Sequence, residues 1–458
     1  MRRISIIGLG RSGEAAALLA KNDGFSVLVS DSSNGDDVRR RAEDLSRQGI
    51  FVELGEHSKK ILDAEIIVVS PGVPLDIEIL KEAEKSKIPV ISEIEFAYRH
   101  EQGKVIAITG SNGKSTTATL VARIFESAGY TTFLAGNIGN PYSSSVMKTS
   151  PSSITVLELS SFQLEAMDSF HPYVAAILNL SPDHLDRYSS PDDYFAAKFH
   201  IFDNQSADDY AVLWADQKEL KSLSERIFAQ TIFFSSSSEV KYGADVRNNT
   251  IYRSGEEILN VEKLGIPGPH NLNNALAAVA MTIPFDVSAK ILGRTLREFK
   301  GIEHRLERFF EHRGIVFVND SKATNPDSLK YALLSFERPI VLIAGGYDKG
   351  ADFSGLRDIF SKRVKAAVFT GDTGERMAAQ LCDVVDFCAV IWEFEKGVRR
   401  AVSLAAEGDV LLLSPGCASF DQFKNFEHRG RFFKEIVQKI IAERDSDKTA
   451  KIPATRGN

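Results

Sequence analysis

Short apolar runs alternate with amphipathic stretches along most of the chain, and the runs end in polar or glycine-rich turns. In the first 93 residues, the apolar runs at 4–7, 26–29, 51–52 and 65–69 are typical of strands. Helix-like stretches at 13–22 and 36–48 separate them. Strands joined through helices form parallel sheets. The pattern therefore predicts a parallel α/β unit at the N-terminus.

The same alternation continues in two further units. We expect a central unit with strands at 105–108, 154–159 and 174–178, helices at 117–128, 194–202 and 267–280, and short strands within 235–260. We expect a C-terminal unit with strands at 315–319, 340–344, 366–369 and 410–413. The charged tail after residue 443 should fray. The sequence thus predicts three α/β domains, each a mostly parallel sheet with flanking helices, at 1–93, 94–302 and 303–458.

A glycine-rich loop, Gly110-Ser111-Asn112-Gly113-Lys114-Ser115-Thr116, joins an expected strand to an expected helix. Its glycines let the backbone approach a phosphate closely, and the free amides of the helix start point at that phosphate. Lys114 adds a positive charge, and the two hydroxyl residues can bind Mg²⁺. The strict phosphate-loop pattern has glycine where this chain has Ile108. The order of strand, glycines, lysine and hydroxyls still favours phosphate binding over an ordinary turn.

Two more glycine turns follow strands of the N-terminal unit. Residues 8–13 have the pattern G-x-G-x-x-G, and Asp31 follows the next strand, where a dinucleotide-binding fold places its ribose-binding carboxylate. The second turn is Ser70-Pro71-Gly72. Alone, the first turn indicates NAD, but the same geometry serves any diphosphate at a helix start. Both turns are also compatible with a purely structural role.

Three polar side chains of the central unit stand out from apolar or strand-end surroundings. Glu158 lies in an apolar strand, where a carboxylate is costly unless it meets a cation, so it is a candidate metal ligand. His184 follows a strand, at the edge where α/β sheets bind ligands, although loop histidines are as often surface groups. Lys198 lies in a nearly apolar helix, where its ammonium group could instead reach solvent along the surface.

Further candidates are found on either side of residue 303. Asn271 and Asn274 lie one turn apart on a helix, where they could cap it or bind a nucleobase. Lys322 and Lys349 lie in turns that follow two C-terminal strands. A fold alone does not require two lysines there, so we expect an anionic ligand at that edge.

Composition narrows the class of protein. The 55 basic residues against 62 acidic ones give a net charge of −7, so no global basic field can hold nucleic acid or an anionic membrane. Cys382, Cys388 and Cys417 are too few and too clustered for a disulfide framework, which fits a reducing compartment. We find no signal-peptide core and no run near the roughly 20 apolar residues of a membrane span. We expect a cytoplasmic protein without a membrane span or nucleic-acid partner.

A series of segments, in one order and across all three expected domains, resembles the Mur ligase family. They are GSNGKST, VLELSSFQLE, NLSPDHLDRY, YFAAKFHIF, GPHNLNNALAA, GIEHRLE, VNDSKATNPDS, GGYDKGADF and LLLSPGCASFDQFKNFEHRG. The last is similar to the family members that add D-glutamate rather than L-alanine, a third residue or a dipeptide. The family's phosphate loop is itself a short form, so Ile108 does not count against ATP.

The resemblance implies an ATP-dependent ligase of peptidoglycan precursor synthesis that acts on small molecules as a monomer. ATP would phosphorylate the lactoyl-alanine carboxylate of a UDP-sugar to an acyl phosphate. The amine of D-glutamate would then attack, giving an amide, ADP and phosphate. Such a transfer depends on positioning and charge neutralisation, so the resemblance also implies Mg²⁺, with two ions expected. The domains would be Rossmann-like, P-loop ATPase-like and again Rossmann-like.

The resemblance also implies roles for single residues. ATP would contact Gly110, Asn112, Gly113, Lys114, Ser115, Thr116, Asn271, Asn274, Arg305 and Asp320. The UDP-sugar would contact Gly10, Arg11, Ser12, Asp31, Ser70, Gly72, Asn137, Ser160, Gln163 and His184. D-Glutamate would contact Lys322, Thr324, Lys349, Ser419, Phe420 and Phe426. Mg²⁺ would be held by Ser115, Glu158, His184 and Lys198, and catalysis would depend on Lys114, Glu158, His184 and Lys198.

Within this scheme Lys198 would be carbamylated by CO₂. An ammonium group about 4 Å from a divalent ion would be repelled by roughly 8 kcal/mol at an effective dielectric constant of 20, so the side chain must be modified or turned away. Two positions depart from the family pattern. Phe420 stands where a smaller aliphatic residue is common, and Ser32-Ser33 replace a more typical Thr-Arg.

Three other classes compete with this interpretation. An NAD-dependent dehydrogenase would explain residues 8–13 and Asp31 but not the phosphate loop, Lys198 or the third domain. A nucleotide-binding switch would hydrolyse ATP slowly, whatever other substrates are present. A folate polyglutamylating ligase would share the logic of the central domain, but it would not need a diphosphate-binding turn at the N-terminus.

Overall fold

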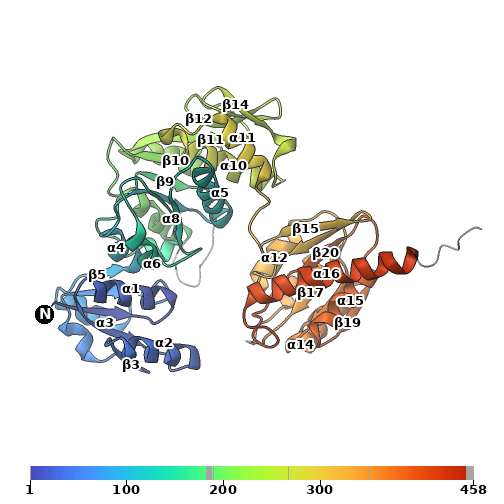
Figure 1. Cartoon of the computed structure of the whole chain (residues 1–458), viewed down its shortest axis with the longest axis horizontal. Coiled ribbons are helices and arrows are strands. Elements are labelled where there is room, and N and C mark those ends of the chain that lie inside the picture. Colours follow the sequence, from blue (N-terminus) through green and yellow to red (C-terminus); the bar gives the residue numbers. More distant parts are fainter. Residues whose placement is uncertain (1, 182–187, 189, 267, 349, 450–458) are drawn as a thin grey trace, which may run out of the picture. The chain divides into compact units, whose positions relative to one another are not determined.

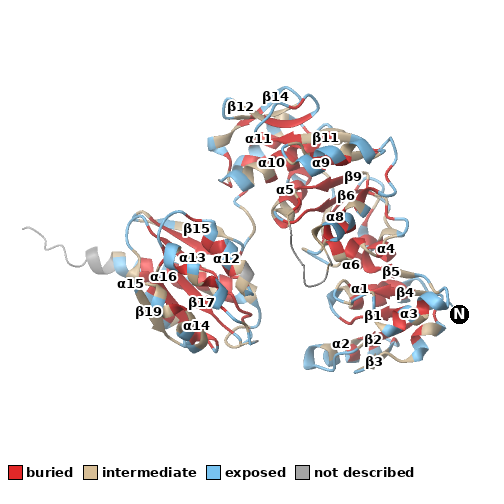
Figure 2. Ribbon diagram, turned by 180° about the vertical axis from the view of Figure 1, so that it is seen from behind, coloured by how far each residue is buried: buried red, intermediate tan, exposed pale blue. Residues whose placement is uncertain are grey.

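The computed structural model describes residues 2–181, 188, 190–266, 268–348 and 350–449 (Figure 1). The chain divides into two compact units, Met1–Phe299 and Lys300–Asn458. The first unit contains two sheets and the second contains one. Buried strands lie at the centre of each sheet, between helices whose outer faces are exposed (Figure 2).

The N-terminal sheet is wholly parallel. Its strands, in spatial order, are β3 (Phe51–Leu54), β2 (Ser26–Asp31), β1 (Arg3–Ile7), β4 (Ile66–Val69) and β5 (Val90–Ser92). Its helices are α1 (Arg11–Asn22), α2 (Asp36–Arg47), α3 (Glu78–Lys85) and α4 (Glu93–Tyr98). Only residues 8–10 separate the end of β1 from the start of α1, so this turn lies at the carboxyl edge of the sheet.

The central sheet is parallel except for a three-stranded antiparallel margin formed by β12, β13 and β14. In spatial order its strands are β14 (Glu256–Asn260), β13 (Thr250–Arg253), β12 (Gly243–Arg247), β11 (Gln230–Ser235), β10 (Tyr210–Trp214), β9 (Val174–Ile177), β6 (Lys104–Thr109), β8 (Ile154–Glu158) and β7 (Thr132–Gly136). Its helices are α5 (Lys114–Ser127), α6 (Tyr142–Ser145), α7 (Ser161–Leu164), α8 (Pro191–Phe199), α9 (Lys218–Leu223), α10 (Pro269–Met281) and α11 (Ala289–Glu298).

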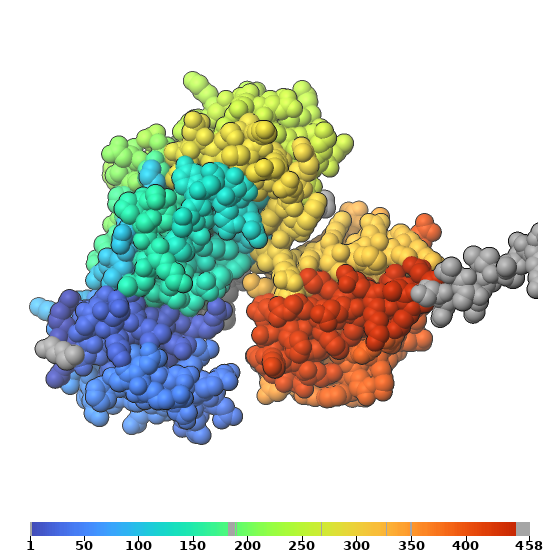
Figure 3. Space-filling model, in the orientation of Figure 1, coloured from blue at the N-terminus to red at the C-terminus, as the bar shows by residue number. Residues whose placement is uncertain are grey.

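The C-terminal sheet is parallel except for its edge strand β15. Its order is β15 (Glu307–His312), β16 (Ile315–Asn319), β20 (Val410–Leu413), β17 (Ile340–Gly345), β18 (Val364–Thr370) and β19 (Phe387–Val390). One face is covered by α12 (Pro326–Leu334), α13 (Arg357–Arg363) and α14 (Gly374–Leu381). The other is covered by α15 (Phe394–Leu404) and α16 (Phe426–Thr449), which forms a broad part of the unit's surface in Figure 3.

A single apolar cluster joins the two sheets of the first unit. It includes Ile4 and Val29 of the N-terminal sheet and Leu157 and Ile177 of the central sheet, each with 1% exposure or less. Polar contacts reinforce it: the buried Glu95 of α4 accepts hydrogen bonds from the backbone N–H groups of residues 168–170. Because burial of apolar surface is the main stabilising term in folding, these two sheets share one core.

The predicted fold class is confirmed, including strands at all the expected positions and the short strands within 235–260. The pattern missed strands β5, β7, β10, β11, β15 and β19. The predicted helix at 117–128 starts earlier, at Lys114, so Lys114, Ser115 and Thr116 form its first turn. The missed strands share no one signal: some are short or lie at a sheet edge, where alternation is hardest to recognise.

The expectation that the tail frays after residue 443 is wrong for residues 444–449, because α16 continues to Thr449, and the rest of the tail lies outside the described residues. Two ion pairs at the end of the helix contribute. Glu443 pairs with Arg399 of α15 at 2.8 Å, and Asp445 pairs with Arg313 at 2.7 Å. Both pairs join the end of the helix to its own unit, although each adds little stability because it is exposed.

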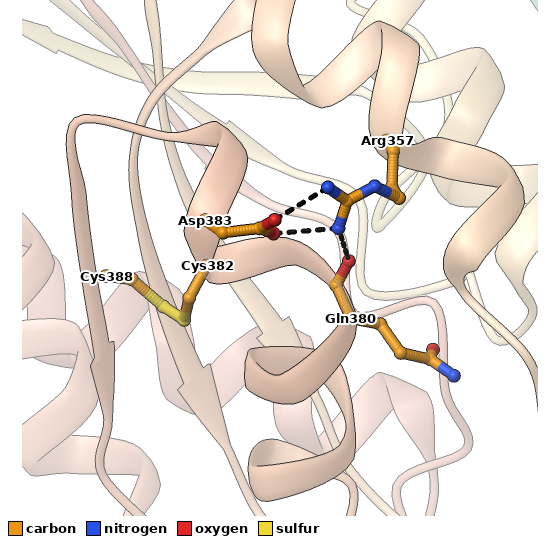
Figure 4. The surroundings of a disulfide bond; sticks show 5 residues. All are labelled: Arg357, Gln380, Cys382, Asp383 and Cys388. Atoms are coloured by element: carbon orange, nitrogen blue, oxygen red, sulfur yellow. Dashed lines mark hydrogen bonds and ion pairs between the residues drawn. A yellow bond between two sulfur atoms is a disulfide. The ribbon is translucent and has the colours of Figure 1, made fainter.

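Two of the three cysteines are paired, although no disulfide framework was expected. Cys382 and Cys388 form a disulfide between the end of α14 and β19, with their Cα atoms 5.4 Å apart (Figure 4). Beside it, Arg357 donates to both carboxylate oxygens of Asp383 and to the carbonyl of Gln380. Cys417 is free and buried. This one local bridge is not a disulfide framework.

Among the described residues, no helix is both long enough and apolar enough to cross a membrane.

Candidate functional site

The carboxyl edge of the central sheet gathers the phosphate loop and its neighbours. β6 pairs with β8 on one side and β9 on the other, so the loop after β6 lies between the ends of those strands. Gly110 has φ +147° and Gly113 has φ +82°, conformations that side chains rarely adopt. The N–H of Asn112 donates to Asn179 Oδ1 at 2.8 Å, which fixes the loop to the chain after β9. The loop is therefore built by its own glycines and by a neighbouring strand.

Lys114 folds back over the loop. Its Nζ donates to the carbonyl of Gly110 at 2.8 Å and to that of Ser111 at 3.0 Å. The ammonium group therefore lies against the loop backbone, where a phosphate-loop lysine meets the outer phosphate oxygens of a nucleotide. Ser115 is buried with 4% exposure, and Thr116 is half-buried, both in the first turn of α5. The free amides and the dipole of this turn favour an anion.

The two asparagines of α10 reach the same loop. A Cβ atom at Gly113 would lie 2.2 Å from Asn274 Oδ1, so the asparagine side chain packs directly against this glycine. Asn274 Nδ2 also donates to Asn271 Oδ1 at 3.3 Å. The structure thus brings Asn271 and Asn274 beside the phosphate loop, although the two are some 160 residues away in the chain from Gly113.

Glu158 ends the strand next to the phosphate loop. Its side chain is buried with 1% exposure, and Oε1 accepts a hydrogen bond from Asn137 Nδ2 at 2.8 Å. Oε2 is buried and has no hydrogen-bond partner among the described residues. An unsatisfied carboxylate oxygen in a protein interior is costly, and Mg²⁺ prefers oxygen ligands. Glu158 is therefore a residue that could hold a divalent cation at this edge.

Lys198 is carried to the loop by α8. The lysine is buried with 1% exposure, and its Nζ donates to the carbonyl of Gly110 at 3.2 Å. Nζ also lies 4.3 Å from the centre of the Tyr194 ring. The alternative that this side chain reaches solvent is wrong, since the ammonium group is directed at the phosphate loop instead. His184 lies outside the described residues.

Two residues assigned to the UDP-sugar cap a short helix. The side-chain oxygen of Gln163 accepts from the backbone N–H of Ser160 at 2.9 Å and from its hydroxyl at 3.0 Å. In return, Ser160 caps the N–H of Gln163, which completes a capping box at the start of α7. These bonds fix the backbone conformation of the segment that follows Glu158. Ser160 itself is half-buried.

The first turn of the N-terminal unit is closely packed on its inner side and open on its outer side. A Cβ at Gly13 would lie 1.8 Å from the carbonyl oxygen of Gly8, so only glycine fits there. A Cβ at Gly10 or Gly72 would meet nothing within 4 Å. Gly10 is the N-cap of α1 and has no side chain to cap the helix, so the amides of Arg11 and Ser12 remain available for an anion.

Asp31 and Ser70 hold this turn in shape. Asp31 Oδ2 accepts from the N–H of Leu9 at 2.6 Å, and Oδ1 accepts from the N–H of Ser33 at 2.7 Å. The hydroxyl of Ser70 donates to the carbonyl of Gly8 at 3.0 Å. Arg11 Nη2 donates to the carbonyl of Gly139 at 3.1 Å, which links the turn to the loop that carries Asn137. The N-terminal turn and the Glu158 edge are thus connected within one unit.

In the C-terminal unit, Asp320 is buried with 5% exposure at the end of β16. Oδ2 accepts from the hydroxyl of Ser414 at 2.8 Å, and Oδ1 accepts from the N–H of Leu306 at 3.1 Å. Burial raises the pKa of Asp320 to about 7, against the opposing effects of these bonds and of Arg305 and Arg429. The carboxylate therefore orders the turn that bears Arg305, which has its own polar contacts.

The raised pKa of Asp320 gives a testable pH dependence. Between about pH 4 and pH 7 the folded carboxyl keeps a proton that the unfolded chain has released, so stability falls as the pH rises through this window. We expect Asp320→Asn to remove this loss, which is at most about 4 kcal/mol. Urea unfolding at pH 5 and pH 8, followed by Trp392 fluorescence in a Trp214→Phe background, measures it. Equal pH dependence with and without the substitution would contradict the prediction.

The residues assigned to D-glutamate lie on two loops and one helix start of the C-terminal unit. Lys322 and Thr324 follow β16, Ser419 and Phe420 follow β20, and Phe426 begins α16. Ser419 is buried with 2% exposure, whereas Phe420 is 60% exposed with its ring centroid 6.4 Å from that of Tyr347. The structure gathers these five at one edge of the sheet. Lys349 lies outside the described residues.

Two residues of these edges were not singled out from the sequence. Asn179 fixes the phosphate loop, and Arg429 is a buried cation of α16 that binds the loops after β16 and β20. Each lies within a segment that resembles the family, and that position was the only available signal. Their roles depend on contacts between distant parts of the chain.

Comparisons with known proteins agree with this arrangement. The Mur ligase MurD-like N-terminal domain matches residues 2–92, the Mur ligase middle domain matches 108–282, and the glutamate ligase domain of Mur ligases matches 304–417. The chain belongs to the Mur ligase family.

Within the family, the chain is similar to proteins of one activity. It is 42% identical to the UDP-N-acetylmuramoylalanine–D-glutamate ligase of Koribacter versatilis, over 96% of this chain and 98% of that one. It is 41% identical to the ligase of the same name from Pelotomaculum thermopropionicum, over 95% and 97%. The three competing classes do not fit relatives that match along almost the whole chain.

Solved structures share the fold at lower identity. UDP-N-acetylmuramate-alanine ligase from Thermotoga maritima aligns with a TM-score of 0.58 and 21% identity, over 96% of this chain and 100% of that one. The MurF ligase from Thermotoga maritima in complex with ADP aligns with a TM-score of 0.56 and 16% identity, over 92% and 96%. At such identities the likeness concerns the fold.

Proposed function

We propose that this chain is an ATP-dependent ligase that joins the alanine carboxylate of UDP-N-acetylmuramoyl-L-alanine to the amine of D-glutamate. The observation that carries the proposal is the buried, unpartnered oxygen of Glu158 on the strand beside a phosphate loop. That arrangement supports a nucleotide phosphate and a divalent cation in the same place. The near full-length likeness to ligases of this name supports the choice of substrates.

The proposed reaction has two steps. A carboxylate oxygen of the alanine attacks the γ-phosphorus of ATP, and the bond to the bridging oxygen breaks to release ADP. The nitrogen of D-glutamate then attacks the acyl carbon, the bond to phosphate breaks, and the nitrogen loses a proton. Because phosphoryl transfer is accelerated by positioning and charge stabilisation, the loop of residues 110–116 and the cation of Lys114 are proposed to hold the phosphates. Asn271 and Asn274 are proposed to contact the adenine, and Arg305 and Asp320 the phosphate and ribose.

Magnesium is part of this proposal. When bound, it would neutralise charge on the phosphate oxygens. Glu158 and Ser115 would hold it, together with His184 and a carbamate on Lys198, and we propose two ions. The support for the carbamate is electrostatic: an unmodified ammonium at Gly110 lies where phosphate-bound Mg²⁺ is expected, and the two cations would repel each other. A carbamate would turn this repulsion into attraction.

The remaining assignments concern the substrates. The open amides of Arg11 and Ser12, with Gly10, Asp31, Ser70 and Gly72, are proposed to bind the uridine diphosphate. Asn137, Ser160, Gln163 and His184 are proposed to line the sugar and alanine end. The five described residues of the C-terminal edge and Lys349 are proposed to bind D-glutamate, with the lysines paired to its carboxylates.

A phosphate-release assay tests the function. With ATP, Mg²⁺ and UDP-N-acetylmuramoyl-L-alanine, we expect rapid phosphate release with D-glutamate and little with L-glutamate, L-lysine or D-alanine. Mass spectrometry should show one new amide bond in the product. Slow ATP hydrolysis that none of the amino acids accelerates would refute the proposal and favour a nucleotide-binding switch.

Three broader properties are proposed with this function. The chain would contain three functional domains, 1–93, 94–302 and 303–458, of which the first two correspond to the first compact unit apart from residues 300–302. The protein would act as a monomer in the cytoplasm, where the precursors are made. Alkylation of the denatured, unreduced protein counts its thiols: one free cysteine, Cys417, is expected if the disulfide forms in the cell, and three if it does not.

A further inference from the structure

Among the described residues of the C-terminal unit, Arg429 is the least exposed arginine or lysine. It lies in the first turns of α16, with 2% exposure. Its guanidinium group donates four hydrogen bonds. Nε donates to Ser321 Oγ at 3.0 Å, and Nη2 donates to the carbonyls of Ser321 at 2.9 Å and Cys417 at 3.1 Å. Nη1 donates to the carbonyl of Ala418 at 3.1 Å.

These partners are all neutral. Among the described residues, Arg429 forms no ion pair with a carboxylate within 4.0 Å, and Asp421 and Asp320 act on its charge only from a greater distance. A buried charge without a partner of opposite sign is costly, and burial accordingly lowers the pKa of Arg429 to about 10. A hydrophobic residue of similar size would avoid this cost. The arginine is therefore best explained by what its hydrogen bonds hold in place.

The bonds of Arg429 join three separate parts of the chain. Ser321 lies directly before Lys322 in the loop after β16. Cys417 and Ala418 lie directly before Ser419 and Phe420 in the loop after β20. The third part is α16 itself, and the hydroxyl of Ser321 also donates to the carbonyl of Phe426 at 2.8 Å.

A fourth segment is attached through the same loop. The N–H of Tyr347 donates to the carbonyl of Ala418 at 3.0 Å, which ties the loop after β17 to the one after β20. Gly346 passes so close that a Cβ there would lie 2.3 Å from the carbonyl oxygen of Ala418 and 3.0 Å from Arg429 Nη1. The guanidinium group thus holds the loops after β16 and β20 together, and the bond from Tyr347 attaches the loop after β17 to the second of them.

We infer that Arg429 is a positioning residue for the amine-donor site: it sets the distance between the Lys322 loop and the Ser419 loop without touching the substrate. This inference rests on the proposed function. Arginine suits the task because its planar group presents five N–H donors in fixed directions, whereas lysine presents one point charge on a flexible stem. Loss of the guanidinium should loosen the amine-donor site and leave the first chemical step intact.

Hydroxylamine separates the two steps. As a small nucleophile it can attack the acyl carbon of an acyl phosphate and expel phosphate, giving a hydroxamate without use of the D-glutamate site. In Arg429→Lys and Arg429→Met we expect the KM for D-glutamate to rise about tenfold or more, which corresponds to about 1.4 kcal/mol. The rate of hydroxamate formation should stay within about twofold of the unsubstituted protein.

Two further variants help to distinguish a local effect on the amine-donor site from misfolding. Ser321→Ala removes the acceptor of Arg429 Nε and the bond to Phe426 but leaves the other three bonds of the guanidinium, so a smaller rise in KM is expected. Arg431→Met changes an exposed arginine two residues further along α16 and should leave the KM unchanged. Thermal unfolding of each variant reports whether the unit is intact.

The outcomes separate this inference from the proposed function. If the unsubstituted protein forms neither hydroxamate nor D-glutamyl product, the function itself is wrong. If it forms both, and the Arg429 and Ser321 variants keep the normal KM for D-glutamate, the inference is overturned. It is also overturned if hydroxamate formation and ligation fall together with the unfolding temperature, since that result indicates a role in folding alone.

Discussion

Lys198→Ala is expected to abolish ligation, and a short carboxylate such as acetate or propionate is expected to restore part of it. The reason is the position of the side chain: it is buried, and its terminal atom lies at the Gly110 carbonyl of the phosphate loop. A carbamate there would supply negative charge to Mg²⁺, and a small carboxylate in the cavity left by alanine would supply the same charge. Phosphate release with and without added carboxylate measures the effect.

Lys114→Ala is the matched control for this rescue. It removes a second lysine at the same carbonyl, but one proposed to act as a cation on the phosphates. It should be equally inactive, and carboxylates should not restore it. Intact-protein mass spectrometry at high bicarbonate should show the added CO₂ on the unsubstituted protein but not on Lys198→Ala. Full activity in Lys198→Ala would remove the carbamate hypothesis.

Glu158→Gln is expected to lower kcat by about 10²- to 10³-fold, the usual cost of removing one group that stabilises developing charge. The substitution keeps the size of the side chain and its contact with Asn137 but removes the negative charge of the unpartnered oxygen. The Mg²⁺ concentration needed for half-maximal activity should rise at the same time. Initial rates over a Mg²⁺ titration test both expectations.

Glu93→Gln supplies a closely matched comparison. Glu93 is also 1% exposed, also has one hydrogen-bonded oxygen and one unpartnered oxygen, and belongs to the same unit. It lies on α4, however, away from the phosphate loop, and burial raises its pKa. Glu93→Gln should therefore leave the Mg²⁺ dependence unchanged. Equal effects of the two substitutions would mean that Glu158 is only a buried structural carboxylate.

The sequence predicted those site residues whose role depends on local backbone structure. It did not predict those whose role depends on contacts with distant parts of the chain. The phosphate loop could be predicted because its glycines and helix start are local, and the structure gives Gly110 and Gly113 the positive φ values that such a loop needs. Glu158 could be predicted because a carboxylate in an apolar strand is conspicuous. Periodicity likewise gave the parallel strands that bring Glu158 beside this loop.

The structural roles of other residues could not be predicted from the amino-acid sequence alone. Asp31 has the spacing of a ribose ligand, yet both its oxygens accept backbone N–H groups of nearby turns. Gln163 serves as a helix cap, and Asp320 holds the Arg305 turn from inside the core. Arg429 was overlooked because a charged residue in a helix is usually exposed, and only the packing of two remote loops around it shows its role.

The apolar cluster that joins the first two sheets also determines which fragments of the chain can fold on their own. A fragment ending near residue 93 would lack α4 and would leave the apolar side of α1 open to water, so it should aggregate rather than fold. A fragment ending at Phe299 would keep that cluster closed and should melt in a single cooperative transition. Anyone preparing pieces of this enzyme for crystallisation or binding studies would therefore obtain two usable parts, not three.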